Sequence, residues 1–196
     1  MIPPKGGKPV SQAVAIQPTR PALRWHGGKW RLAPWIIEHF PPHRVYVEPF
    51  GGAASVLIRK ARSYAEVYND MDDDVVNLFQ VLRSEQGHKL VELLRLTPFG
   101  RVEFQNAYQQ STYPLERARR LVIRSYQGFG SDAHISQRQT GFRANSSRSG
   151  TTPAHDWANY PPALAAIIER LAGVVVEHRP ARLVMAAHDS LETLHY

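Results

Sequence analysis

Apolar residues along the chain fall into short continuous runs and into segments with helical spacing. Four short runs predict strands: 45–47, 65–68, 174–176 and the approach to a fourth strand at 191–196. Helical spacing predicts helices at 30–40, 53–61, 72–83, 87–127 and 163–172. Because strands and helices alternate, we expect an α/β fold whose parallel strands are joined by right-handed βαβ connections.

Two stretches poor in large aliphatic residues divide the chain. Residues 1–20 are rich in proline and glycine, which predicts a flexible N-terminal arm. Residues 128–160 are rich in Gly, Ser, Arg, Gln and Asn, and such long irregular segments are usually functional or disordered. We therefore expect one α/β domain over 21–83 and 161–196, interrupted by a mainly helical insertion at 84–160.

The amino-acid composition excludes several classes of protein. The chain has 43% hydrophobic and 21% charged residues, as an ordinary globular protein does, and no cysteine, which excludes disulfides and thiolate metal sites. The histidines show no metal-ligand spacing, so we expect no metal. No apolar run approaches the roughly 20 residues that span a bilayer. These features predict a cytoplasmic protein that neither spans a membrane nor is secreted.

Positive charge is concentrated in one segment. The net charge of the chain is +7. Residues 117–148 contain seven arginines and only one acidic residue, Asp132. Such a patch gains affinity for a polyanion by releasing phosphate counterions, although a solvated basic face has the same composition. Aromatic residues lie between these arginines or just beyond them, and each could stack on a base or belong to the core: Tyr126, Phe129, Phe142 and Trp157.

Three motifs carry candidate chemistry. The sequence 25–29, Trp-His-Gly-Gly-Lys, offers a flat ring, two permissive glycines and a cation, but it could also be a simple turn. The sequence 48–55, Glu-Pro-Phe-Gly-Gly-Ala-Ala-Ser, follows a strand and lets a ligand approach a helix N-terminus, which Ser55 could cap. Asp70 ends the second strand, where an acid can bind ribose hydroxyls; the acids after it could instead cap a helix.

In this order the three motifs resemble those of the adenine-specific DNA methyltransferases of the orphan adenine methylase type, which include phage members. Further likeness lies in the sequences of 71–79, 174–179 and 189–196. The resemblance implies a Rossmann-like methyltransferase sheet, S-adenosyl-L-methionine as cofactor and double-stranded DNA as partner. It also implies that the insertion at 84–160 recognises the DNA target.

The resemblance assigns roles to individual residues. Trp25 and Lys29 would contact S-adenosylmethionine, and Asp70 would hold its ribose. The loop around its methionine part would comprise Phe50, Gly51, Gly52, Ala53 and Ser55. DNA contacts are expected from four arginines of the insertion: Arg124, Arg138, Arg143 and Arg148.

One family motif is missing from this sequence. The family's catalytic tetrapeptide, Asp/Asn-Pro-Pro-Tyr/Phe, holds the amino group of a flipped adenine, and it is expected just after Tyr196. We therefore assign no catalytic residue and expect a sheet incomplete at its C-terminal side, with a separate C-terminal half as a candidate partner. Many members of the family have an acid at the position of Pro180 that helps to hold the cofactor adenine. Because this chain has proline there, we assign no residue to that contact. The alternatives are a non-catalytic remnant that binds DNA or cofactor, and an unrelated nucleotide-binding enzyme, which the absent Walker lysine disfavours.

Overall fold

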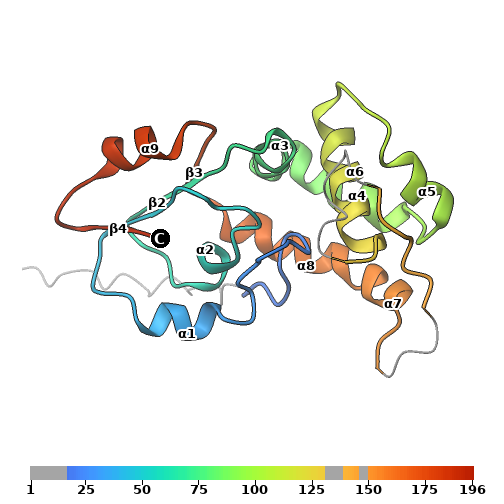
Figure 1. Ribbon diagram of the computed structural model, residues 1–196, viewed down its shortest axis with the longest axis horizontal. Helices are drawn as coiled ribbons and strands as arrows, with labels where there is room; N and C mark the ends of the chain where they lie inside the picture. The colour runs from blue at the N-terminus through green and yellow to red at the C-terminus, as the bar shows by residue number, and fades with distance from the viewer. Residues whose placement is uncertain (1–16, 131–138, 146–149) are drawn as a thin grey trace, which may run out of the picture.

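A parallel four-stranded sheet forms one end of the molecule. The computed structural model describes residues 17–130, 139–145 and 150–196, and within them the strand order is β3-β2-β1-β4 (Figure 1). The strands are β1 (Val45–Glu48), β2 (Ala65–Asn69), β3 (Val174–Glu177) and β4 (Thr193–His195). Each pairing is parallel, with Val47 opposite both Val67 and His195. The predicted α/β fold with a parallel sheet is confirmed.

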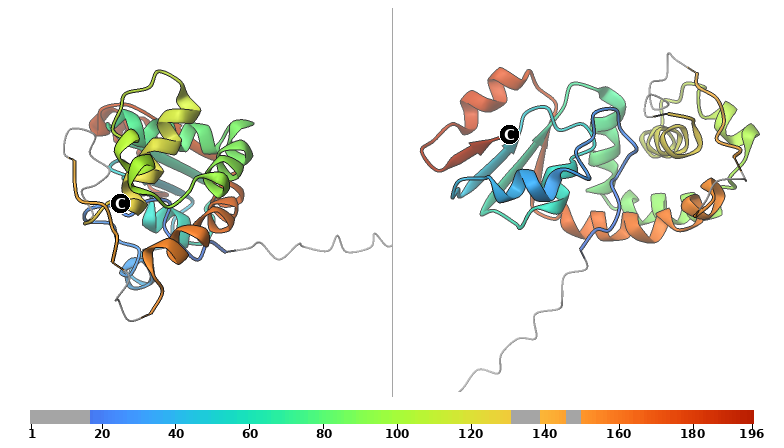
Figure 2. Two further views of the ribbon diagram at one scale, coloured as in Figure 1. Left: turned by 90° about the vertical axis from the view of Figure 1, so that its right-hand side faces the viewer. Right: turned by 60° about the horizontal axis from the view of Figure 1, so that its bottom comes forward.

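Helices cover the sheet and continue into a second, helical end. Around the sheet lie α1 (Ala33–Glu38), α2 (Ser55–Arg59), α3 (Asp73–Leu82), α8 (Tyr160–Arg170) and α9 (Ala181–His188). The helical end comprises α4 (Gln86–Leu96), α5 (Arg101–Asn106), α6 (Pro114–Gln127) and α7 (Pro153–Ala158). The right-hand view of Figure 2 places these four helices together, with α3 and α8 leading to them from the sheet. No helix among the described residues is long and apolar enough to cross a membrane.

Alternating residues of the strands face two different layers. Tyr46 and Tyr68 are fully buried in the main core, which continues without a break through α3, α6 and α8. Val47 and Val67 point to the opposite face, where they pack against Val184 of α9 in a small separate cluster. The period-2 pattern of the strands thus explains why both faces are apolar. The main core extends into the helical end, so the sheet end and the helical end share one core.

Three charged side chains are buried beneath the sheet. Glu66 of β2 accepts from Lys60 at 3.0 Å and from Arg170 of α8 at 2.7 Å. Arg170 also donates to the carbonyl of Leu57 in α2, at 2.6 Å. Burial raises the pKa of Glu66, but the hydrogen bonds and charges of Arg170 and Lys60 outweigh it and lower that pKa. The network therefore joins α2, β2 and α8 through an ionised carboxylate.

Several boundaries differ from those that the sequence predicts. Helix α9 was not predicted, and α7 lies in the segment 128–160 that was expected to be irregular. Helix α8 begins at Tyr160 and includes Pro161 and Pro162 in its first turn, where a missing N–H is tolerated. Of the expected N-terminal arm, residues 1–16 lie outside the described residues. Arg20 donates to the carbonyl of Asp156 at 3.2 Å, which ties the last part of that arm to α7.

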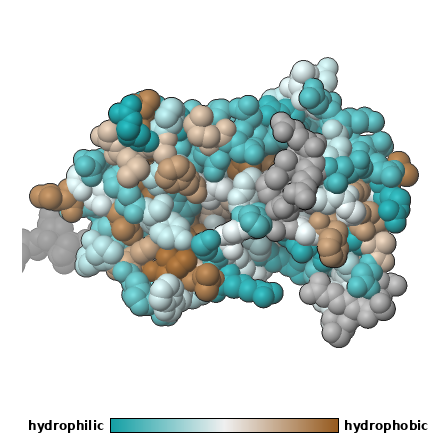
Figure 3. Space-filling model, in the orientation of Figure 1, coloured by the Kyte–Doolittle hydropathy of each residue, from teal (hydrophilic) through white to brown (hydrophobic). Residues whose placement is uncertain are grey.

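The surface differs between the two ends of the molecule. On the face seen in Figure 3, apolar side chains gather mainly over the sheet end, whereas the helical end is largely hydrophilic. Exposed apolar residues of the sheet end include Leu32, Trp35, Val175 and Leu191. The helical end has exposed apolar residues of its own, Leu96, Val102, Tyr113 and Phe129, so its hydrophilic character is a property of the face shown in Figure 3.

Candidate functional site

A cavity of about 320 Å³ lies at the carboxyl end of the sheet. Two of the sequence motifs, 25–29 and 48–55, supply nearly its whole lining, and Val56 and Tyr196, which directly follows β4, complete it. Ligands of open parallel sheets bind at this edge, beyond the carboxyl ends of the strands. The lining residues are Trp25, His26, Gly27, Gly28, Lys29, Glu48, Phe50, Gly51, Gly52, Ala53, Ser55, Val56 and Tyr196.

The loop after β1 is held in a conformation that favours glycine. Gly52 has φ +48°, and a Cβ atom on it would lie 2.8 Å from Nε1 of Trp25. A Cβ atom on Gly51 would lie 2.3 Å from the ring of Tyr68. Ala54 adopts the left-handed region as well, with φ 51°. The two glycines thus let the loop lie directly against Trp25 on one side and β2 on the other.

Asp70 fastens this loop to the end of β2. Its Oδ2 accepts a hydrogen bond from the backbone N–H of Gly52 at 2.7 Å, and Oδ1 accepts from the N–H of Asp72 at 2.9 Å. The hydroxyl of Tyr68 donates to the carbonyl of Gly52 at 2.7 Å. Asp70 is not itself among the residues that line the cavity, but it is hydrogen-bonded to Gly52, which is. Asp72 accepts from the N–H groups of Asp74 and Val75, so it caps α3, as the alternative interpretation of the acids proposed.

Glu48 is the buried acid of the cavity wall. Its Oε1 accepts from the hydroxyl of Tyr46 and from the N–H of Leu57, both at 2.7 Å. Burial raises the pKa of Glu48 to about 7, against the opposing effect of these hydrogen bonds and of Lys60 and Arg170. The carboxyl group therefore changes its charge near neutral pH. The sequence motif contained Glu48, but its side chain was not assigned a role because burial could not be read from the motif.

The other expected cofactor residues differ in exposure and bonding. Lys29 is exposed and its Nζ donates to the carbonyl of Gly27 at 2.5 Å. The Phe50 side chain is 80% exposed at the cavity rim. Ser55 was expected to be able to cap α2, which is wrong: the N-cap is Ala54, and no side chain caps this helix. Ser55 is instead the first residue of α2 and lines the cavity.

The arginines expected to bind DNA do not form one exposed patch. Arg124 is 3% exposed, and its guanidinium donates to Asp74 and to the carbonyl of Ala107. Arg143 is 8% exposed and donates to the carbonyl of Tyr126 at 3.0 Å. Both guanidinium groups are therefore held inside the helical end, and in this conformation neither presents itself to DNA. Arg138 and Arg148 lie outside the described residues.

The aromatic residues of the insertion divide between the core and the surface. Tyr126 and Trp157 are buried, as the core interpretation expected. Phe129 is 72% exposed, and its N–H donates to the carbonyl of Gly141 at 2.6 Å. Arg101, which the sequence did not single out, is exposed and its guanidinium carbon lies 5.1 Å from the centroid of the Phe142 ring. Arg101 lies outside the dense basic segment and was missed because sequence position does not show which cations share a surface.

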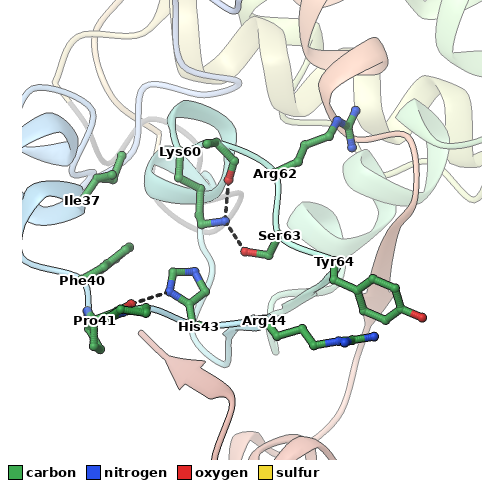
Figure 4. A pocket seen from close by; sticks show the side chains of 11 residues that line it. Ile37, Phe40, Pro41, His43, Arg44, Lys60, Arg62, Ser63 and Tyr64 are labelled. Carbon is green, nitrogen blue, oxygen red and sulfur yellow. Dashed lines mark hydrogen bonds between the residues drawn. The ribbon is translucent and has the colours of Figure 1, made fainter.

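A second hollow, of about 630 Å³, lies at the amino ends of β1 and β2, away from the three motifs. Figure 4 shows Lys60 there, with Nζ bonded to the carbonyl of Ala61 and to the hydroxyl of Ser63. Nearby, the guanidinium of Arg44 lies 3.9 Å from the ring centroid of Tyr64. The polar groups of this hollow are thus engaged with neighbouring protein groups. In the described residues, no three His, Cys, Asp or Glu side chains are grouped as a metal site requires.

Comparison with known proteins adds independent evidence. Over 66 residues the chain is 36% identical to a DNA adenine methylase of Vibrio cholerae, an alignment covering 34% of this chain and 24% of the relative. Over 68 residues it is 32% identical to a DNA adenine methylase of Serratia marcescens, covering 35% and 25%. A DNA N-6-adenine-methyltransferase of Escherichia phage P1 is 27% identical over 100 residues, covering 48% and 13%. These alignments span about a quarter of the length of the relatives or less.

The strongest comparison is with a family model. The model described as D12 class N6 adenine-specific DNA methyltransferase matches residues 25–127, which is more than half of the 196 residues. The match begins at Trp25, includes the whole loop around Gly52 and ends with α6. The chain belongs to the D12 class of N6 adenine-specific DNA methyltransferases.

Proposed function

We propose that this chain provides the S-adenosylmethionine site and a DNA-contacting region of an adenine-N6 DNA methyltransferase. The observation that carries the proposal is the cavity beside β1, which two separate motifs of a D12-class chain build together. A volume of about 320 Å³ suits a small-molecule ligand. When bound, the cofactor would supply the methyl group that the reaction transfers.

The residues of the cavity fit a nucleoside cofactor without a pyrophosphate. Trp25 offers a flat apolar surface, and Gly51 and Gly52 leave room for a ligand to approach the loop backbone. The carboxylate oxygens of Asp70 retain lone pairs that can accept from ribose hydroxyls. Hydrogen bonds from Gly52 to Asp70 and from Tyr68 to Gly52 hold the loop, so little of it must be ordered on binding.

The DNA-contacting region is proposed at the helical end. Arg101 and Phe129 are both exposed there, and residues 139–145 connect them, since Phe142 lies under Arg101 and Gly141 accepts from Phe129. An arginine can bind phosphate or a guanine edge, and an exposed phenylalanine can stack on an unpaired base. Arg138 and Arg148 remain proposed DNA contacts from the sequence.

The transfer step requires groups that this sequence does not contain. No Asp/Asn-Pro-Pro-Tyr/Phe tetrapeptide occurs in the 196 residues. We propose that these residues bind cofactor and DNA, and that a C-terminal half carrying the tetrapeptide completes the transfer. Co-expression with such a C-terminal half is expected to restore methylation of adenine. Methyl transfer by the chain alone would contradict this part of the proposal.

Cofactor binding is tested by calorimetry with S-adenosylhomocysteine. We expect saturable binding by the intact chain and a loss of at least about tenfold in affinity for Trp25→Ala and for Asp70→Ala. Unchanged affinity in both variants would place the ligand elsewhere. No binding by the folded, intact chain would remove the cofactor proposal.

DNA binding is tested by titrating a duplex at several salt concentrations. Arg101→Ala is expected to weaken binding and to reduce the salt slope by about one. Arg44→Ala is the matched control, because it removes the same charge from an exposed arginine at the amino end of β1. Equal effects of the two substitutions would indicate a general effect of net charge and contradict the proposed contact.

A further inference from the structure

The segment that precedes Trp25 is held by side chains from the helical end and from α8. The hydroxyl of Tyr126 donates to the carbonyl of Pro21 at 2.7 Å, and that of Tyr160 donates to the carbonyl of Ala22 at 2.6 Å. The two rings lie with their centroids 4.1 Å apart. Residues 20–24 are thus fixed by residues more than one hundred positions later in the chain.

Among these hydrogen bonds, those of Ser125 in α6 are made to the residue nearest to Trp25 in the sequence. Its hydroxyl is fully buried, accepts from the N–H of Arg24 at 2.7 Å and donates to the carbonyl of Arg24 at 3.0 Å. One side chain therefore satisfies both backbone groups of the residue next to Trp25. Removing the hydroxyl would take from both part-buried groups the partner that they have here, and would release Arg24 from α6.

The contacts continue from Arg24 into the cavity. Trp25 follows directly, and its carbonyl accepts from the N–H of Gly28 at 3.1 Å, which closes the turn that carries Lys29. The indole of Trp25 lies so close to Gly52 that a Cβ there would be 2.8 Å away. A shift of Arg24 would therefore displace both walls of the cavity that the sequence motifs form.

The last turn of α6, which carries Ser125, also holds residues 139–145, the segment proposed to contact DNA. The carbonyl of Gln127 accepts from the N–H of Arg143 at 2.8 Å, and the carbonyl of Tyr126 accepts from its guanidinium at 3.0 Å. Gly128 forms a bridge with Phe142. The last turn of α6 thus lies between residues 20–25 on one side and residues 139–145 on the other.

We propose that Ser125 is a positioning residue for the cofactor site: its hydroxyl fixes Arg24 and thereby sets Trp25 against the loop at Gly52. The inference rests on the proposed cofactor function and deepens it, because the helical end then contributes to cofactor affinity without touching the cofactor. Ser125 itself does not line the cavity.

The test compares Ser125→Ala with a control that removes a different buried hydroxyl of the helical end. Thr97→Val is that control: Thr97 is 7% exposed, its hydroxyl donates to the carbonyl of Leu93, and it makes none of the bonds to residues 20–24. Calorimetry with S-adenosylhomocysteine is done on proteins shown by circular dichroism to be folded. We expect affinity to fall about tenfold in Ser125→Ala and to stay within about twofold in Thr97→Val.

Hydrogen exchange at the amides of residues 25–29 provides a readout that a general loss of stability would not give. We expect faster exchange there in Ser125→Ala and wild-type exchange in Thr97→Val. If Ser125→Ala does not fold, Tyr126→Phe removes only the hydroxyl bonded to Pro21 and is expected to show the same effects in weaker form.

The possible outcomes separate the two proposals. Wild-type affinity together with wild-type exchange in the serine variant, or equal losses in the threonine control, would overturn the positioning role. If the intact chain binds no S-adenosylhomocysteine, the proposed cofactor function fails, and the exchange measurement still decides whether Ser125 holds this segment.

Discussion

The buried acid of the cavity wall gives a pH dependence that can be worked out from the structure. Glu48 has its pKa raised from 4.5 to about 7, first of all by burial. Between these values the folded protein keeps the proton while the unfolded chain loses it. Stability from this group is therefore fully present below about pH 4.5 and is lost as the pH rises to about 7. A shift of this size corresponds to about 3 kcal/mol.

The substitution Glu48→Gln removes the titration while keeping an oxygen that can accept from Tyr46 and Leu57. We measure urea unfolding of both proteins between about pH 5 and pH 8 and subtract the free energies at each pH. The variant is expected to gain about 2–3 kcal/mol relative to the wild type across this range. At the upper end the wild type buries a charged carboxylate and the variant a neutral amide.

The difference between the two proteins isolates Glu48 from every other titrating group. Glu92→Gln is the control, because this side chain is 61% exposed in its ion pair with Arg95. Because solvent screens this exposed ion pair, Glu92→Gln is expected to change the free energy of unfolding by less than about 1 kcal/mol. If the Glu48→Gln difference is flat with pH, the raised pKa is refuted, and with it the description of Glu48 as a group that changes charge near neutral pH.

Three further substitutions test other parts of the structure. Glu66→Gln should lower the free energy of unfolding by about 3 kcal/mol in urea titrations, since two buried cations lose their anion; less than about 1 kcal/mol would contradict this. Gly52→Ala should abolish calorimetric binding of S-adenosylhomocysteine, whereas Gly100→Ala, with nothing within 4 Å of the added Cβ, should bind normally. Arg124→Met should lower the thermal midpoint but leave the salt slope of DNA binding unchanged; a slope reduced by about one would show a phosphate contact.

The sheet and the cofactor motifs were predictable because their signals are local. The runs at Val45 and Ala65 are short, apolar and followed by turn residues, so their place as neighbouring parallel strands follows from the βαβ rule. Trp25 and the loop at Gly52, which the resemblance assigned to one ligand, line one cavity, and their contact with the cofactor stays a prediction. The placement of α9 was missed because Ala181–His188 is short and only Val184 of it is buried.

The partners of the arginines were not predictable from the sequence. A dense run of cations indicates a basic surface, but Arg124 is paired with Asp74, fifty positions earlier, through the packing of α3 on α6. Arg143 is buried against the end of α6. The hydroxyl of Ser125 was equally invisible, because its partner Arg24 is 101 positions away. Long-range hydrogen bonds, unlike strand patterns, leave no periodic trace in a sequence.

The central claim is that the cavity beside β1 holds the cofactor, and the backbone amides report on it directly. Proton–nitrogen correlation spectra of the chain are recorded while S-adenosylhomocysteine is added. The account predicts that the largest shifts fall on residues 25–29 and 50–55, including the N–H of Gly52. Shifts concentrated on residues 40–44 and 60–64, which line the hollow at the other end of the sheet, or no shifts at all, would contradict it.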